Sequence, residues 1–170
     1  MEFRSAGPED LSEVQTLYRQ LINFMGDDNP ALWDDEYPIG VFGEDIAAGR
    51  LYVLLDEGKI ISAVALSPTH EAEEAFAWEE PAASAVYLER LGVHTAYGRQ
   101  GIGRKMVEEA MEIAKRLGVA YLRLFVVDVN EPAMQFYESL GFMRLEGEYE
   151  MIISEDDKII EYAFEIRLDN

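Results

Sequence analysis

The sequence predicts one α/β domain built around a mixed sheet, and three observations lead to that fold class. Apolar runs of strand length alternate with helical patterns along the whole chain. Residues 119–127 are almost entirely apolar, which is typical of a strand that is covered on both faces. No internal repeat, low-complexity tract or linker divides the 170 residues, so we expect a single domain over residues 1–170.

The N-terminal part of the chain predicts strands and helices whose limits are set by turn residues. In order, we expect a strand at 2–6, a helix from 8 to about 25, a shorter helix near 42–48, and strands at 51–55 and 60–66. The long helix carries an apolar stripe at helical spacing, formed by Leu11, Val14, Leu17, Tyr18, Leu21 and Ile22. Residues 26–30 (GDDNP) end that helix, and the turn at 56–59 (DEGK) joins the two strands into a hairpin.

The C-terminal part predicts a loop, two helices and four strands. We expect a polar loop at 69–83 with Trp78, Glu79 and Glu80 exposed in its middle, followed by a strand at 85–93. A helix should run from 102 and stop at Gly118, and a strand should follow at 119–127. A short helix ending at 140–141 and two closing strands, at about 142–153 and 158–167 and paired through 154–157, complete the chain. The stripe of the long helix is Ile102, Met106, Val107, Ala110, Ile113, Ala114 and Leu117.

The composition is strongly acidic, with 34 Asp and Glu against 14 Lys and Arg and a formal net charge of −20. Such a surface repels nucleic acid and anionic membranes and attracts cations, although the charge is equally typical of any soluble acidic protein. The absence of cysteine excludes disulfides, thiolate metal sites and a cysteine nucleophile, and ligands other than carboxylates are too scarce to predict a metal site. No signal peptide or membrane-spanning run is present, so we expect a cytoplasmic protein.

A glycine turn at the start of the long helix is the clearest chemical signal. Residues 90–107 contain no acidic side chain but hold Arg90, His94, Arg99, Arg104 and Lys105. A glycine turn at a helix start presents free backbone N–H groups, which favours phosphate or pyrophosphate over a purely structural turn. The pattern is neither a P-loop, because Arg104 follows its second glycine, nor a dinucleotide fingerprint, because Met106 replaces the third glycine.

Two segments together resemble the GNAT superfamily of acyl-CoA N-acyltransferases. One is LGVHTAYGRQGIG at 91–103, and the other is NEPAMQFYESLGF at 130–142. Trp33-Asp34-Asp35-Glu36-Tyr37-Pro38 and Arg90-Leu91-Gly92-Val93 further resemble the W-D-x-x-Y-P and R-L-A-V stretches of a bacterial subset of that family. The Gln or Arg that the family places three residues before the first glycine of the turn is Gly98 here, with Arg99 and Gln100 following it.

The resemblance implies a fold and a cofactor site. It implies a mixed, mostly antiparallel sheet of six to seven strands, with a central parallel pair splayed around the acyl-CoA site and about four helices on both faces. Acetyl-CoA is the implied cofactor: the backbones of Leu91 and Val93 would pair with its pantetheine arm, and the Val93 N–H would stabilise the oxyanion. The pyrophosphate would bind to Arg99, Gln100, Gly101, Ile102, Gly103 and Arg104, and Asn130 would hydrogen-bond the pantetheine portion.

Two side chains are candidates for proton transfer. The resemblance makes Tyr137 the acid that protonates the departing thiolate, whereas without its spacing to Asn130 and Gly141-Phe142 a core aromatic residue on a short helix would be the better explanation. Glu89 lies among apolar neighbours four residues before Val93, which would suit a general base for the acceptor amine. An ion pair with a neighbouring basic side chain explains Glu89 as well, and a water chain could replace it as base. His70 and His94 are better explained as surface loop residues.

The acceptor is expected to be a primary amine of a small, cationic molecule or of a peptide or protein. Trp33, Tyr37, Trp78 and Glu89, with the acids Asp34, Asp35, Glu79 and Glu80, supply rings and carboxylates that suit a cation, although both tryptophans could simply fill the core. Without a cysteine, we expect direct transfer with no acyl-enzyme intermediate. A non-catalytic acyl-CoA-binding or regulatory module and a plain interaction domain are the alternatives. Many members of the family form homodimers, and the length of the acyl group and the acceptor stay open.

Overall fold

The computed structural model describes residues 1–29, 33–152 and 158–169. They form two compact units, Met1–Leu66 with Leu88–Ala110, and Ser67–Tyr87 with Met111–Asn170. Strand β4 (Ala85–Val93) and helix α3 (Ile102–Arg116) each contribute residues to both units. One domain over residues 1–170 stays a prediction. Within the described ranges, every helix is too short or too polar to cross a membrane.

The strands form one mixed sheet in the order β1-β2-β3-β4-β5-β8-β6, with β7 paired to β8. The remaining strands are β1 (Glu2–Ser5), β2 (Leu51–Asp56), β3 (Lys59–Ser67), β5 (Tyr121–Val127), β6 (Met143–Arg144), β7 (Tyr149–Ile152) and β8 (Lys158–Arg167). The other helices are α1 (Leu11–Met25), α2 (Phe42–Ala47) and α4 (Glu131–Ser139), with short 3₁₀ turns at Pro8–Asp10, Gly26–Asp28, Ile39–Val41, Glu73–Ala75 and Thr95–Tyr97. The predicted fold class, a mixed sheet with one central parallel pair and four helices, is confirmed.

The sheet has eight strands because the strand predicted at 142–153 is divided into β6 and β7. Gly147 lies between the two strands with a φ of 103°, a conformation that interrupts an extended chain. Both pieces still pair with β8, antiparallel. The predicted connection at 154–157, together with Ile153 and with Pro30 of the predicted helix end, lies outside the described residues.

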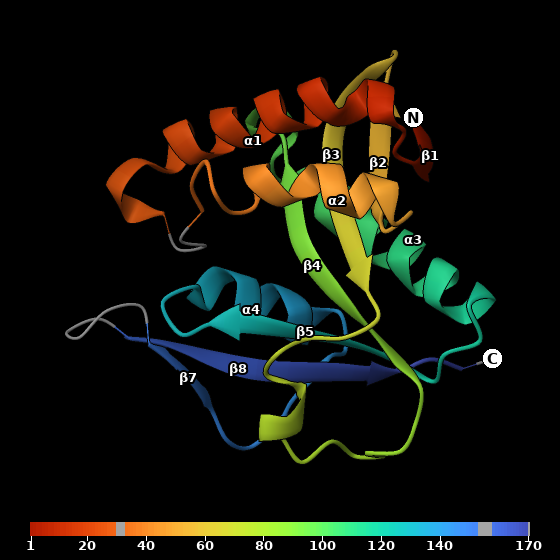
Figure 1. Ribbon diagram of the computed structural model, residues 1–170, viewed down its shortest axis with the longest axis vertical. Coiled ribbons are helices and arrows are strands. Elements are labelled where there is room, and N and C mark those ends of the chain that lie inside the picture. The colour runs from red at the N-terminus through yellow and green to blue at the C-terminus, as the bar shows by residue number, and fades with distance from the viewer. Residues whose placement is uncertain (30–32, 153–157, 170) are drawn as a thin grey trace. The chain divides into compact units, whose positions relative to one another are not determined.

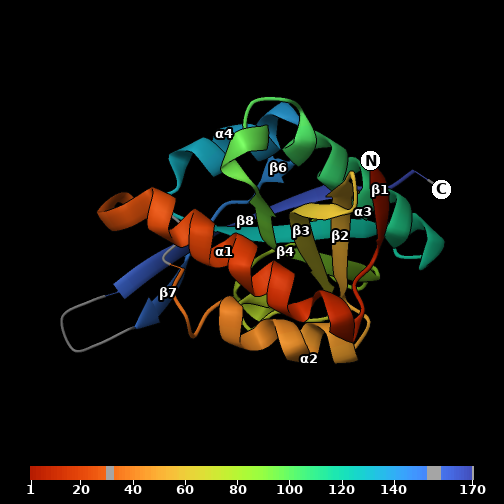
Figure 2. The same ribbon diagram turned by 90° about the horizontal axis from the view of Figure 1, so that it is seen from above.

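The first unit packs helices α1 and α2 against the β2–β3 hairpin. The two helices lie side by side (Figure 1), and Figure 2 shows both on the same side of strands β2 and β3. The stripe predicted for α1 faces this core: Val14, Leu17, Tyr18 and Leu21 are buried, and Leu11 and Ile22 pack partly buried against the same cluster. Burial of this stripe, rather than helix propensity alone, holds α1 in place.

Strand β4 departs from regular geometry in the first unit. Arg90 has a φ of 57°, a left-handed conformation that is rare for a side chain with a Cβ. The buried Tyr18 hydroxyl shares its proton between the carbonyl oxygens of Arg90 and, at 3.1 Å, Ala63, and the Ser62 hydroxyl donates to the Gly92 carbonyl at 2.6 Å. These side-chain hydrogen bonds satisfy carbonyl groups around the irregular residue, so the strained conformation is held from two elements.

The second unit is built on the antiparallel pair β5 and β8, which run side by side in Figure 1. Their register extends from Tyr121↔Arg167 to Val127↔Glu161, and β5 is buried over most of its length, as predicted for residues 119–127. Trp78 was predicted to be exposed, and this is wrong: its side chain is 7% exposed and packs with Phe76 and Tyr87. Leu117, placed on the buried stripe of the long helix, is 60% exposed because α3 already ends at Arg116.

The close approach of Tyr18 to Gly92 gives a stability prediction. A Cβ on Gly92 would lie 2.7 Å from the Tyr18 Cζ and Oη atoms and 3.0 Å from Leu21 Cδ1. We expect Gly92→Ala to lower the free energy of unfolding by about 1–3 kcal/mol, because the ring cannot move without losing its buried hydrogen bonds. Denaturant unfolding measures this change. Gly43→Ala is the control, since its Cβ would meet only Leu11 at 3.9 Å, and equal stability of the two variants would contradict the prediction.

Candidate active site

The turn before helix α3 presents a run of unused backbone donors. Within the first unit, no protein group accepts a hydrogen bond from the backbone N–H groups of residues 99–104, whereas the next amide, that of Lys105, donates to Gly101 at 3.0 Å. Arg99 and Gly101 have φ values of 60° and 79°, and space is open around the Cα of Gly101. Successive free N–H groups at a helix start form a ready site for an anion.

The same turn is fixed from its N-terminal side. The His94 ring accepts a hydrogen bond from the Ala96 N–H at 3.1 Å, and the Gln100 side chain donates to the Ala96 carbonyl at 2.9 Å. His94 is therefore a half-buried cap, and the Gln100 side chain is used within the protein. Ile102 is buried, so it can offer a ligand only its backbone, whereas Arg99 and Arg104 are exposed cations beside the free amides.

Leu91 and Val93 lie on the part of β4 that follows Arg90. Within the second unit β4 pairs with β5 at Ala85–Tyr87, and within the first unit the residue after β4, His94, donates to Ile61 of β3 at 2.8 Å. Both side chains are half-buried, on the opposite side of the strand from Gly92. Main-chain groups of an extended segment are the kind that an extended ligand can use.

A network of charges surrounds Arg90. The Arg90 guanidinium lies 2.7 Å from the Glu89 carboxylate and 3.0 Å from Asp45, and it donates to the Tyr37 hydroxyl at 3.3 Å. Asp45 is 1% exposed and is also 3.0 Å from Arg50. Neighbouring residues of a regular strand point to opposite faces, so the left-handed Arg90 is what allows two consecutive side chains to meet. The ion-pair explanation of Glu89 is therefore present in the structure.

Burial and charge act against each other in this network. Burial raises the pKa of Asp45, and the guanidinium groups of Arg90 and Arg50 oppose that effect. For Arg90, burial acts to lower the pKa, but Glu89, Tyr37 and Asp45 outweigh it and raise the pKa. The guanidinium consequently stays charged and holds Glu89, Asp45 and Tyr37 around one point.

The segment 33–38 forms a tight turn that presents Tyr37. The Asp34 carboxylate accepts from the backbone N–H groups of Glu36 and Tyr37, both at 2.8 Å, so its role is to shape the turn. Trp33 packs against the Tyr18 ring with centroids 5.1 Å apart, and Asp35 pairs with Arg19 on the surface. The structure therefore brings Tyr37 and Glu89 to Arg90, while Trp33 belongs with the core.

The second unit holds the other two residues that the resemblance implied for the cofactor. Asn130 caps helix α4, its side-chain oxygen accepting from the Ala133 N–H at 3.3 Å, and its amide nitrogen has no partner among the described residues. Tyr137 is buried between Phe136 and Phe142, with ring centroids 5.1 and 5.6 Å away. Burial raises the pKa of Tyr137, which keeps its hydroxyl protonated and able to give a proton.

In the loop at 69–83, the glutamates that line a pocket differ from the two that the sequence predicted. Glu79 and Glu80 accept from the Tyr121 hydroxyl at 3.0 and 3.1 Å, and Glu80 also pairs with Arg167. His70 lies in this loop, half-buried, with its ring stacked on Phe125 at a centroid distance of 4.1 Å. In place of the two glutamates, Glu73 and Glu74 line a pocket together with Trp78.

The sequence reasoning missed Glu73, Glu74, Tyr87 and Arg123 as site residues. A signal was available for the last of these: Tyr121, Arg123 and Phe125 alternate along β5 and must share one face. An arginine among aromatic residues on a buried strand requires a buried partner, and Glu165 provides it at 3.2 Å. Among the described residues, no three His, Asp or Glu side chains are placed to hold a metal ion.

Comparison with known proteins identifies the family. Residues 17–142 match the model of the acetyltransferase (GNAT) family. The chain belongs to the GNAT family. The match contains the free amides before α3 as well as Asn130 and Tyr137, so the two segments that carried the resemblance lie inside the family domain.

Individual GNAT relatives are similar over part of the chain. Bovine (Bos taurus) thialysine N-epsilon-acetyltransferase is 43% identical over 56 residues, which is 33% of each protein, and the ribosomal protein bS18-alanine N-acetyltransferase of Escherichia coli K12 is 38% identical over 68 residues, 40% of this chain and 46% of that one. The chain thus spans about a third to a half of the length of these relatives. The structure of YncA from Salmonella typhimurium, solved with acetyl-CoA, covers 100% of this chain and 95% of its own at a TM-score of 0.68 and 16% identity, which supports the GNAT fold.

The network around Arg90 gives a second prediction. Asp45→Asn removes the buried carboxylate that faces two guanidinium groups, so we expect it to lower the free energy of unfolding by about 3–5 kcal/mol. Asp35→Asn breaks an exposed pair with Arg19 and should cost less than about 1 kcal/mol. Urea unfolding of both variants measures the difference. Equal losses would mean that Asp45 does not anchor Arg90.

Proposed function

We propose that this chain is an acetyl-CoA-dependent N-acetyltransferase that moves the acetyl group directly to a primary amine. The observation that carries the proposal is the run of free amides at residues 99–104, beside the exposed Arg99 and Arg104. Backbone donors and arginines suit a diphosphate, and the adenosine carrier of an acyl group contains one. Membership of the GNAT family and the acetyl-CoA bound to YncA support the same cofactor.

The residues of this chain would divide the work between binding and proton transfer. The amides of residues 99–104 would bind the diphosphate, and the free amide nitrogen of Asn130 would donate to a carbonyl of the pantetheine portion. The thioester supplies the acetyl group. The Val93 N–H would donate to its carbonyl oxygen as the amine nitrogen bonds to the carbonyl carbon and the C–S bond breaks. Tyr137, which burial keeps protonated, would give its hydroxyl proton to the sulfur.

Glu89 would take the proton that the attacking amine must lose, directly or through a chain of waters. Its carboxylate is 15% exposed and has one orientation fixed by Arg90, which Asp45 and Tyr37 hold in turn. This assigns two roles to one ion pair: Arg90 positions the carboxylate, and the carboxylate accepts the proton. The acceptor would be a small cationic amine or the amine of a protein. Cytoplasmic location and pairing as a homodimer stay predictions from the sequence.

Turnover of acetyl-CoA with a panel of amines, grouped by charge and size, tests this function. We expect thioester loss that depends on an amine, with initial rates of a sequential pattern because no acyl-enzyme forms. Tyr137→Phe should lower kcat about 10²–10⁴-fold while the Kd of acetyl-CoA changes less than twofold, since the ring and its packing remain.

Phe136→Leu is the control for loss of aromatic packing next to Tyr137, and it should keep most of the turnover. Binding of acetyl-CoA without turnover over the whole panel would favour the non-catalytic module. Ping-pong kinetics would overturn direct transfer, and an unchanged kcat in Tyr137→Phe would remove Tyr137 from the mechanism.

A pH profile tests Glu89. We expect Glu89→Gln to lower kcat/KM about 100-fold near pH 7 and to lose less at high pH, where the free amine is already neutral. The control Glu36→Gln changes an exposed acid of the same unit and should match the wild type at every pH. A uniform loss at all pH values would assign Glu89 a purely structural role.

A further inference from the structure

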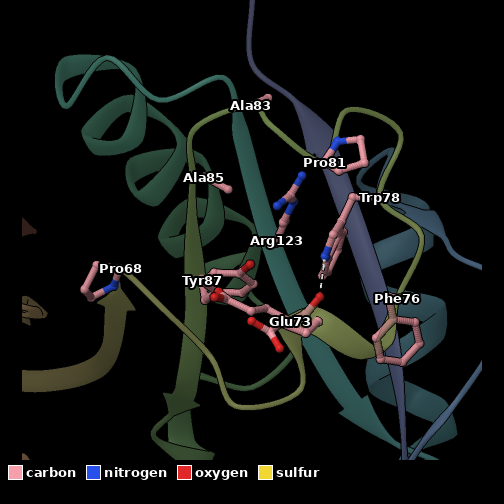
Figure 3. A pocket seen from close by; sticks show the side chains of 10 residues that line it. Pro68, Glu73, Phe76, Trp78, Pro81, Ala83, Ala85, Tyr87 and Arg123 are labelled. Carbon is pink, nitrogen blue, oxygen red and sulfur yellow. Dashed lines mark hydrogen bonds between the residues drawn. The ribbon is translucent and has the colours of Figure 1, made fainter.

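The second unit contains a pocket that none of the expected cofactor contacts uses. It has a volume of about 460 Å³, within the range of small-molecule sites. Its walls come from the loop between β3 and β4, which provides Glu73, Glu74, Phe76 and Trp78, and from Tyr87 and Arg123 on the strands. Figure 3 shows the Glu73 carboxylate beside the Tyr87 ring, with the Arg123 guanidinium between β4 and Trp78.

The loop that forms the pocket is held by its own hydrogen bonds. The Trp78 indole N–H donates to the Glu73 carbonyl at 2.7 Å, the dashed line in Figure 3, and the Glu79 N–H donates to the buried Glu165 carboxylate at 2.8 Å. The 3₁₀ turn Glu73–Ala75 adds the bond from Ala75 to Ala72 at 3.0 Å. The pocket is consequently preformed and does not need a ligand to order it.

The positive charge in the pocket wall is already neutralised. The Arg123 guanidinium pairs with Glu165 at 3.2 Å, and both side chains are less than 5% exposed. It also donates to the Glu80 carbonyl at 3.2 Å and lies over the Trp78 ring at 4.1 Å from the centroid. Arg123 is therefore part of the wall, and it offers little to an anionic ligand.

The negative charge in the pocket is not neutralised. Glu73 and Glu74 both line it, and in the part of the chain that the structure describes neither forms an ion pair with a lysine or arginine. The Glu73 carboxylate accepts hydrogen bonds from the His70 backbone N–H at 3.4 Å and from the Tyr87 hydroxyl, which leave its charge in place. Aromatic rings next to carboxylates without a basic partner bind organic cations through apolar contact, charge and cation–π attraction. The pocket thus fits an ammonium or guanidinium group on an apolar stem.

Such a pocket stabilises the protonated form of an amine. We propose that Glu73 and Glu74 bind an organic cation, an ammonium group on an apolar stem, in the pocket beside Trp78. The Phe76 and Trp78 rings line the same pocket and suit the apolar stem.

The test compares pentylamine with 1-pentanol, which share the apolar stem and differ in the ammonium group. In the wild type we expect calorimetric titration to give a Kd for pentylamine at least 10-fold lower than that for 1-pentanol. The double variant Glu73→Gln, Glu74→Gln should bring the ratio close to one. Glu71→Gln, an exposed acid of the same loop outside the pocket, is the matched control and should keep the wild-type ratio.

The titrations contain no acetyl-CoA, which separates this inference from the proposed function. Tighter binding of pentylamine, lost in the double variant and kept in Glu71→Gln, supports the pocket even if no amine is acetylated. Equal binding of the two compounds to the wild type, or a preference that survives the double variant, overturns it. A thermal melt of each variant shows that the substitutions leave the fold intact.

Discussion

The conformation of Arg90 is the constraint on which the first unit depends. A left-handed residue inside a strand is unfavourable, and it persists here because other elements hold it. Tyr18 from α1 binds the Arg90 carbonyl, and Asp45 from α2 binds its guanidinium. The helices on this face therefore do more than cover the sheet, since they fix the course of β4 toward the turn before α3.

Gly92 shows how the core sets the sequence of this strand. The bacterial subset that the chain resembles has alanine in this place, but here the Tyr18 ring occupies the space of a Cβ. A large aromatic residue on α1 and a glycine on β4 are two parts of one packing solution, in which the ring lies close enough for its hydroxyl to reach the Arg90 carbonyl. Exchanging only one of them leaves either a cavity or a clash.

The fold could be predicted from the sequence wherever a period or a turn residue marked it. The stripe of α1, the hairpin at 51–66 and the buried β5 follow directly from those signals, and the glycine turn before α3 has the free amides that its composition indicated. The buried residues of a loop follow no such periodic spacing in the sequence. Trp78 lies in the polar loop at 69–83, a setting that predicts exposure, whereas its indole N–H donates to the Glu73 carbonyl and its ring lies against the Arg123 guanidinium.

Ion pairs were the second feature that could not be predicted from the sequence, because they depend on contacts that the fold creates. Glu89 could be read as a base or as an ion-pair partner, and only the backbone conformation of Arg90 shows that the carboxylate and guanidinium meet. In the second unit, Arg123 and Glu165 neutralise each other, and Glu73 and Glu74 line the same pocket without a lysine or arginine partner among the described residues. On the surface of so acidic a chain, two more carboxylates add little to the attraction of cations, but carboxylates that line a preformed aromatic pocket attract a cation to a defined position. Binding of a particular cation therefore depends on where carboxylates without a basic partner lie, and much less on the net charge of −20.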